Sequence, residues 1–271
     1  MNVRTWKTTL SRSAAAVLCA ATLAACGPRE PATDVERLAR GRELVQQMSA
    51  RLAAAKALIV TTTEVRDVVR VAGKKETVSQ TGTYTMRRPD RFHTKVIGGQ
   101  ALESWYNGKV LTIAAHNDKV FGQAPMPETI DRTLDALAER YDMALPLADL
   151  FHSSPEKALL SETTTGGYAG TENVGSTPCY HLSFHDVGVD WELWVPVQGD
   201  PLPARFKVTQ KRRTGQPVAD VTFTQWNVSP QITDATFVPK VPAEYEGVAL
   251  VQRAAAVKHT SPDAAAPPGK K

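Results

Sequence analysis

Cysteine and long hydrophobic runs are both scarce in this chain of 271 residues. Its three cysteines, Cys19, Cys26 and Cys179, are too few for the disulfide framework of a small secreted domain. The longest apolar stretch, residues 14–25, has about 12 residues, whereas a helix needs roughly 20 to span a bilayer. No later segment comes closer to that length. The sequence therefore gives no support for a transmembrane protein.

Motifs of common enzyme classes are also missing. The sequence has no G-x-S-x-G, H-E-x-x-H, P-loop or calcium-loop pattern. Ser154-Pro-Glu-Lys157 matches the S-x-x-K of penicillin-binding enzymes, but neither Ser-Asp-Asn nor Lys-Thr-Gly follows it. A helix N-cap at Ser154, with Pro155 in the first helical position, explains the same residues. We therefore expect a protein that is not an enzyme and uses no cofactor.

The pair His181 and His185 invites a metal site, because two histidines four residues apart share one face of a helix. These residues fall on a predicted strand, where positions four apart lie about 13 Å from each other. One ion cannot bridge that distance. We interpret the histidines as exposed polar positions, with Leu182 and Phe184 facing inward.

The N-terminal segment has the features of an export signal. Arg4, Lys7 and Arg12 precede the apolar stretch, which ends in Leu23-Ala-Ala-Cys26-Gly27. This ending resembles the lipobox of bacterial lipoproteins, in which the cysteine becomes the acylated first residue of the mature chain. The resemblance implies a signal peptide over residues 1–25 and a lipid anchor at Cys26. Because Gly27 and not aspartate follows the cysteine, we expect the outer membrane, with the protein facing the periplasm.

Without residues 1–25, the chain keeps 29 of its 32 basic residues beside 28 acidic ones. A nearly neutral protein of this kind gives no electrostatic argument for nucleic acid as a partner. Acylation of Cys26 would leave Cys179 with no cysteine to pair with. We predict that Cys179 is a small buried residue on a strand.

Residues 26–33 are predicted to be a flexible spacer, followed by one helix from 34 to about 55. Thr33 or Asp34 can cap this helix. An apolar stripe at helical spacing predicts that the helix packs against a sheet. The stripe consists of Val35, Leu38, Val45, Met48 and Leu52.

The periodicity then changes from helical to alternating. Six strands are predicted at 58–71, 76–87, 91–97, 101–106, 109–115 and 119–123. Asn107-Gly108 is a strong hairpin signal, because both residues tolerate positive φ, and Arg88-Pro89-Asp90 marks a further break. Consecutive hairpins of this kind predict an antiparallel meander.

A helical pattern over residues 128–141 and a short apolar segment over 145–151 follow. Strands return at 161–169, 178–185, 189–197, 202–211 and 218–227, and a last one is considered at 244–251. About eleven strands must curl strongly, and the helices must cover the concave side. The prediction is a mainly β (α+β) open antiparallel half-barrel over 34–252, with an N-terminal helix, a helical lid and a disordered tail over 253–271.

Several segments resemble a family of predicted periplasmic proteins of unknown function. They are Met86-Arg87-Arg88-Pro89-Asp90-Arg91, Trp105-Tyr106-Asn107-Gly108-Lys109, residues 125–150, Cys179-Tyr180-His181-Leu182, Val189-Asp190-Trp191-Glu192-Leu193-Trp194 and Pro201-Leu202-Pro203. The resemblance covers about residues 34–240. That family is placed with the lipoprotein-carrier half-barrels similar to LolA and LolB, which shelter acyl chains under helical lids. The resemblance implies this architecture, and no ligand-contacting residue is transferred from it.

The apolar side of the half-barrel is the default ligand site. Trp191, Leu193 and Val195 share one face of their predicted strand, and Trp194 takes the other. For a single tryptophan, plain core packing is the more common role. The candidate ligand-binding residues are Trp105, Ile130, Leu134, Leu137, Trp191 and Leu193.

Two functions stay open. The first is an envelope lipoprotein that binds a lipid, an acyl chain or another apolar ligand, in lipid or lipoprotein trafficking. The second is a non-enzymatic envelope interaction or sensor protein, in which the protein's own helices fill the groove and the surface binds a protein partner.

Overall fold

The computed structural model describes residues 30–69, 74–143, 145, 147–163 and 165–252. The predicted signal peptide 1–25, the acylated Cys26, most of the spacer 26–33 and the tail 253–271 lie outside these ranges. Within them, none of the helices has the length and hydrophobicity needed to cross a membrane.

The first helix, α1 (Asp34–Ala54), begins at a capping box. The Thr33 hydroxyl accepts a hydrogen bond from the Glu36 backbone N–H, and the Glu36 carboxylate accepts from the backbone N–H of Thr33. Of the two predicted caps, Thr33 is therefore the one used. Val45, Met48 and Leu52 are fully buried, as the apolar stripe predicts. Val35 was predicted in the same stripe but is 78% exposed, because it lies in the first turn, ahead of the crossing with the sheet.

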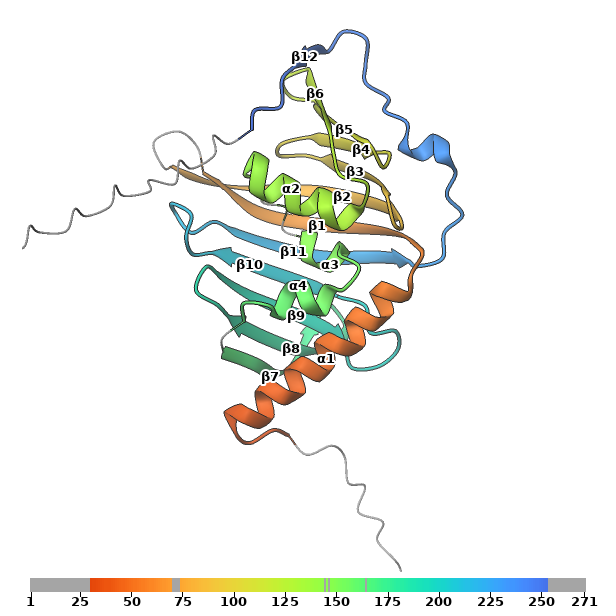
Figure 1. Cartoon of the computed structure of the whole chain (residues 1–271). Coiled ribbons are helices and arrows are strands. Elements are labelled where there is room, and N and C mark those ends of the chain that lie inside the picture. The colour runs from red at the N-terminus through yellow and green to blue at the C-terminus, as the bar shows by residue number, and fades with distance from the viewer. Residues whose placement is uncertain (1–29, 70–73, 144, 146, 164, 253–271) are drawn as a thin grey trace, which may run out of the picture. The chain divides into compact units, whose positions relative to one another are not determined.

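One twelve-stranded sheet dominates the structure (Figure 1). Its strands are β1 (Ala57–Val69), β2 (Lys75–Arg87), β3 (Arg91–Ile97), β4 (Leu102–Tyr106), β5 (Val110–Ala115), β6 (Val120–Pro125), β7 (Thr165–Val174), β8 (Thr177–His185), β9 (Val189–Pro196), β10 (Arg205–Gln210), β11 (Val218–Asn227) and β12 (Glu246–Val248). Their order across the sheet is β12-β6-β5-β4-β3-β2-β1-β11-β10-β9-β8-β7, so the sheet stays open. The β12–β6 pair is parallel, and the other pairs are antiparallel. The predicted mainly β open sheet is confirmed.

The first and last strands of the meanders meet in the middle of the sheet. β1 pairs with β2 along its whole length, and its other edge pairs with β11, with Ile59 opposite Asn227. The sheet therefore has one half made of β1–β6 and another made of β7–β11.

The prediction for β7 was displaced by four residues. The predicted strand began at residue 161, but helix α4 (Pro155–Leu160) extends to that point and the strand begins at Thr165. β7 contains Gly166, Gly167 and Gly170, all with positive φ, and glycine has low intrinsic preference for strands. This composition hid the strand's true extent.

Three shorter helices follow β6 in the chain and lie on the same side of the sheet as α1 (Figure 1). They are α2 (Ile130–Tyr141), α3 (Ala148–Phe151) and α4. Thr129 caps α2, since its hydroxyl accepts from the Arg132 N–H. Pro155 occupies the first turn of α4 as predicted, but the Ser154 side chain makes no capping hydrogen bond. A short 3₁₀ helix, η2 (Asp234–Phe237), was not predicted.

The helix-covered side is called the inner face of the sheet, and the opposite side the outer face. On β1 the buried residues alternate, with Leu58, Val60, Thr62 and Glu64 on the inner face. One apolar cluster joins the inner-face side chains of both halves to α1, α2, α3 and α4. Because side chains alternate between the two faces, every second residue of a strand lies beneath the helices.

Candidate functional site

An apolar cavity of about 140 Å³ lies between strands β1–β5 and a segment that we call the lid, which consists of α2, α3 and the described residues Met143, Leu145 and Leu147 between them. Its apolar lining from the sheet includes Met86, Phe92, Val96, Leu102, Leu111 and Ile113. Its lining from the lid includes Ile130, Leu134, Leu137, Met143, Leu145 and Phe151. Inward-facing strand residues and one face of α2 therefore form its two walls.

The cavity is small in this conformation. A 140 Å³ space is comparable to the engineered cavity of roughly 150 Å³ that holds one benzene molecule. Pockets for larger ligands measure roughly 300–1,000 Å³. A long acyl chain thus needs the lid to move outward.

Hydrogen bonds between chain segments hold the lid in place. Asp131 on α2 accepts from the backbone N–H of Ser153 at 2.9 Å and from its hydroxyl at 2.5 Å. Arg88, in the turn between β2 and β3, donates to the carbonyl oxygen of His152 at 2.9 Å. Burial lowers the pKa of the Arg88 guanidinium, and the charge of Asp131 partly opposes this effect. Two of the segments that resemble the periplasmic family, Met86–Arg91 and residues 125–150, therefore contain residues that hold the lid in place.

A cluster of hydrogen-bonded polar residues is part of the mostly apolar cavity lining. Glu64, on the inner face of β1, is only 4% exposed. Its Oε1 accepts from the Thr62 hydroxyl at 2.8 Å and from the Tyr84 hydroxyl at 2.5 Å, and its Oε2 accepts from Gln80 at 2.7 Å. Three neutral donors thus satisfy most of the acceptor capacity of this carboxylate.

Two further members of the cluster have unusual surroundings. Burial, reinforced by the nearby charge of Glu64, raises the pKa of Tyr84 far above its ordinary value, so its hydroxyl stays a donor. Arg66 lines the cavity two residues after Glu64. Its Nε atom is buried and has no hydrogen-bond partner within the part of the chain that the structure describes.

The structure separates the sequence-predicted site residues into three groups. Ile130, Leu134 and Leu137 line the cavity. Trp191 and Leu193 lie on the inner face of β9, in the buried cluster of the other half, and do not line it.

Trp105 belongs to neither set. It lies on the outer face of β4, opposite His93 on β3, and stacks on the His93 ring with centroids 5.4 Å apart. Its neighbours Ser104 and Tyr106 point inward; Ser104 lines the cavity, and Tyr106 belongs to the buried apolar cluster. The predicted lipidation site, Cys26, lies outside the described residues.

Sequence reasoning missed Glu64, Arg66, Gln80 and Tyr84. A signal for them exists, because Glu64 and Arg66 continue the alternating series of Leu58 and Val60. Charged residues at inward-facing strand positions are expensive unless they are paired, which marks them as functional candidates.

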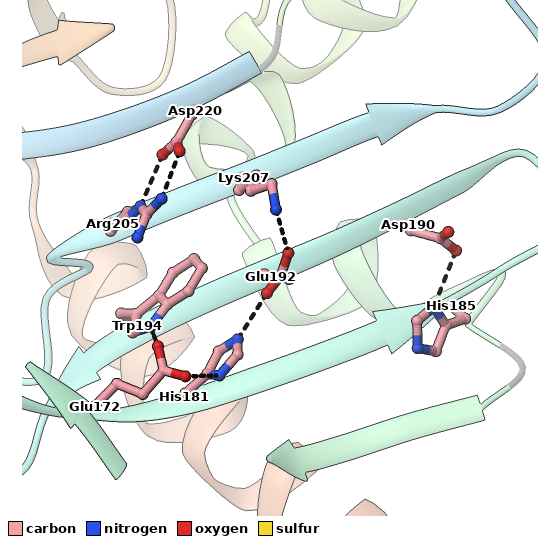
Figure 2. A network of polar contacts seen from close by, with 9 residues as sticks. All are labelled: Glu172, His181, His185, Asp190, Glu192, Trp194, Arg205, Lys207 and Asp220. Atoms are coloured by element: carbon pink, nitrogen blue, oxygen red, sulfur yellow. Dashed lines mark hydrogen bonds and ion pairs between the residues drawn. The ribbon is translucent and has the colours of Figure 1, made fainter. Parts of the chain in front are cut away.

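The outer face of the β7–β11 half carries a network of cross-strand polar contacts (Figure 2). His181 lies between two carboxylates, 2.8 Å from Glu192 and 3.2 Å from Glu172, and its ring stacks on Trp194 at 4.4 Å. Lys207 donates to Glu192 at 2.8 Å. As predicted, His181 and His185 face outward and Leu182 and Phe184 are fully buried, but of the two histidines only His185 is exposed, since the His181 side chain is 13% exposed.

The side chains of this network bind one another and do not point toward one common site. The two ring nitrogens of His181 contact different carboxylates, and Arg205 binds Asp220 through two hydrogen bonds of 2.8 and 2.5 Å (Figure 2). Across the described residues, no group of three or more His, Cys, Asp or Glu side chains has the arrangement of a metal site. The outer-face network therefore contributes pairing between neighbouring strands.

Solved structures with a similar fold come from several bacteria. An uncharacterized conserved protein from Thermus thermophilus has 11% identity and a TM-score of 0.45, covering 77% of this chain and 98% of that chain. The MucA/MucB complex of Pseudomonas aeruginosa has 13% identity and a TM-score of 0.40, and the match covers 74% of this chain and 61% of that chain. A LolA superfamily protein from Nitrosomonas europaea has 8% identity and a TM-score of 0.36, and the match covers 74% of this chain and 98% of that chain. Each is a similarity of fold alone.

No curated protein matches the sequence. Residues 41–251 match the family described as predicted periplasmic protein (DUF2092). This segment includes the strands and lid residues that line the cavity, and it confirms the resemblance found from the sequence. The chain therefore belongs to the DUF2092 family of predicted periplasmic proteins.

Proposed function

We propose that this protein binds a lipid, an acyl chain or another apolar ligand in the cavity beneath the lid, as part of lipid or lipoprotein trafficking in the bacterial envelope. The observation that carries the proposal is an apolar cavity between the sheet and α2 that none of the described side chains fills. Burial of apolar surface would drive binding, at about 0.8 kcal/mol per methylene group. The periplasm is aqueous, so an acyl chain that crosses it needs such cover.

The proposal includes a lid that opens. The lid residues Leu145 and Met143 are at least partly exposed, whereas Ile130 and Leu137 on α2 are only 2% exposed. Displacement of Met143 and Leu145 would enlarge the cavity without unpacking α2. The hydrogen bonds of Asp131 and Arg88 to Ser153 and His152 lie outside this part of the lid and would stay intact.

The proposal also includes a lipid anchor at Cys26 in the outer membrane. It is supported by Leu23-Ala-Ala-Cys26-Gly27 behind a basic and apolar segment. Mass spectrometry of the N-terminal peptide of the mature protein tests it. The expected result is a chain that begins at an acylated Cys26. An N terminus upstream of Cys26 would contradict the anchor.

A separate observation favours a second function. The inner face of the β7–β11 half is already filled, because Trp191 stacks on Phe184 at 4.4 Å and packs in one cluster with Val45 and Met48 of α1. If the lid never opens, the small cavity of the other half stays closed to ligands. The protein would then be an envelope interaction or sensor protein that binds a protein partner at its surface.

Native mass spectrometry combined with lipid extraction distinguishes the two functions. The full chain is produced in a bacterial envelope host and purified beside two variants. Ser104→Phe places a ring in the cavity wall of β4, and Thr83→Phe places one on the exposed outer face of β2. A carrier should retain an amphiphile at a fixed ratio in the wild type and in Thr83→Phe, and lose it in Ser104→Phe. A protein without ligand, even after added phospholipid or fatty acid, would support the filled groove.

A further inference from the structure

Arg66 stands where two cavities meet. It lines the apolar cavity beneath the lid, and it also lines a polar groove of about 940 Å³ on the side of β10 and β11. Its Cα partners across the sheet are Val78 on β2 and Ala219 on β11. The guanidinium therefore borders both an apolar compartment and an open polar one.

Where the two cavities meet, the described polar groups that still lack a hydrogen-bond partner are donors. Glu64 already accepts three hydrogen bonds, so little acceptor capacity is left on it. Arg66 has five N–H donors, and its buried Nε finds no partner among the described residues. An unsatisfied buried donor costs free energy, which a ligand with acceptor oxygens would recover.

The other charges of the groove are largely paired. Arg213 donates to the Asp142 carboxylate at 2.9 Å, and Asp67 lies 3.0 Å from Lys75. Within the described chain, Arg66 forms no ion pair with a carboxylate. Arg212 also lines the groove, but among the described residues Arg66 is the guanidinium that lines both the groove and the apolar cavity.

From this placement we infer that the cavity takes a single-chain amphiphile with an anionic oxygen head group, a carboxylate or a phosphate, which Arg66 binds at the cavity mouth. The inference rests on the proposed function and names its ligand class. A guanidinium binds either head group through paired, charge-assisted hydrogen bonds. The chain would extend from Arg66 past Met86 and Phe92 toward Leu134.

The dimensions favour one chain over two. A cavity of about 140 Å³ accommodates the first part of one chain beside Leu111 and Leu134, and lid movement has to make room for the rest. The larger groove beyond Arg66 leaves space for the head group and its attached water.

Photolabelling tests the inference in the full chain, processed by its host and reconstituted in phosphatidylcholine nanodiscs. The probes are dodecanoate, dodecyl phosphate and dodecanol, each with a diazirine on the chain. Labelling of peptides from β2–β5 and the lid is quantified against probe concentration, so that general partition into the bilayer is separated from binding at the site. The variants are Arg66→Met and Arg66→Lys. Lys95→Met, on the outer face of β3, is the matched control.

The expected result is half-saturation at about tenfold lower concentration for an anionic probe than for dodecanol, as a charged hydrogen bond predicts. Arg66→Met should remove this difference, Arg66→Lys should keep part of it, and Lys95→Met should leave it unchanged. Labelling of each variant by dodecanol shows that the cavity is still formed. Preference for dodecanoate would indicate a free fatty acid, and preference for dodecyl phosphate would indicate a single-chain phosphate lipid such as a lysophospholipid.

Two results would overturn the inference in different ways. If dodecanol labels the cavity as readily as both anions, and Arg66→Met changes nothing, the cavity binds apolar chains but Arg66 does not select their head group. If none of the three probes labels the cavity peptides, the proposed function itself is wrong.

Discussion

Gly41 on α1 and Gly167 on β7 bring helix and edge strand into backbone contact. A Cβ atom on Gly41 would lie 2.7 Å from the Cα of Gly167, and a Cβ on Gly167 would meet the carbonyl oxygen of Arg37. Gly167 also has a φ of +140°. Two glycines thus set the distance between α1 and the β7–β11 half.

We predict that Gly41→Ala destabilises the protein, although alanine favours helices by about 1 kcal/mol over glycine. Overpacking against a backbone that cannot rotate away costs about 1–3 kcal/mol, so the net loss should be about 1 kcal/mol. Thermal unfolding measures it, with Arg42→Ala on the exposed face of α1 as the control. Equal or higher stability of Gly41→Ala would show that the two elements can separate without cost.

A second prediction concerns the buried cluster around Glu64. Tyr84→Phe removes the hydroxyl that donates to Glu64 Oε1 at 2.5 Å and leaves a buried carboxylate with fewer donors. We expect a loss of about 2 kcal/mol in the free energy of unfolding. Tyr141→Phe removes a hydroxyl from an exposed contact with Gln252 and should cost much less. Equal losses in denaturant titrations would contradict the importance of the cluster.

The outer-face network should make stability depend on pH. Burial raises the pKa of Glu192, but hydrogen bonds from Lys207 and His181 outweigh it, and the pKa of Glu192 lies below its ordinary value. A carboxylate with a lowered pKa in the folded state stabilises the fold above about pH 4.3, and the effect is lost as pH falls below that value.

Glu192→Gln should therefore lower the free energy of unfolding by about 1 kcal/mol at pH 7, a modest value for a partly exposed pair. The difference from the wild type should shrink toward zero near pH 3. Glu139→Gln, on the exposed surface of α2, should show no such trend in unfolding measured between these pH values. A difference that is constant across this range would assign the effect to packing.

Cys179 provides a prediction about reactivity. It is fully buried on β8, as predicted from the sequence, and burial raises the pKa of its thiol. The thiolate is the reactive form, so alkylation of the native protein by iodoacetamide at pH 8 should be slower than in denaturant by at least about a hundredfold. Mass spectrometry of the peptide measures this. Rapid labelling of the folded protein would mean that β8 opens locally.

Most of the fold could be predicted because the first six strands follow strict alternation between turns that contain Gly, Asn or Pro. The predicted strand at 91–97 matches β3 residue for residue. The pairing of β1 with β11 could not be predicted, because the sequence pattern of a strand does not identify a pairing partner far away in the chain. The β7 error has a local cause, because glycines replace the β-branched residues that normally signal a strand.

The candidate site was predicted only on its helical side. Ile130, Leu134 and Leu137 share a stripe that could face nothing but the sheet, so their place on the cavity wall followed from periodicity. Trp105 shows the limit of this approach, because alternation defines two faces of β4 but does not say which one is covered. Only the packed helices decide between them.

The pairing of Ile59 with Asn227 has a consequence for how the chain folds. β1–β6 can form from neighbouring hairpins early, but β1 then exposes an open edge until β11, far along the chain, pairs with it. Closing a loop that holds nearly the whole sheet is entropically slow, and open edges pair readily with other chains. We therefore expect refolding limited by the β1–β11 junction, with a lag during which the half-formed sheet is prone to aggregate.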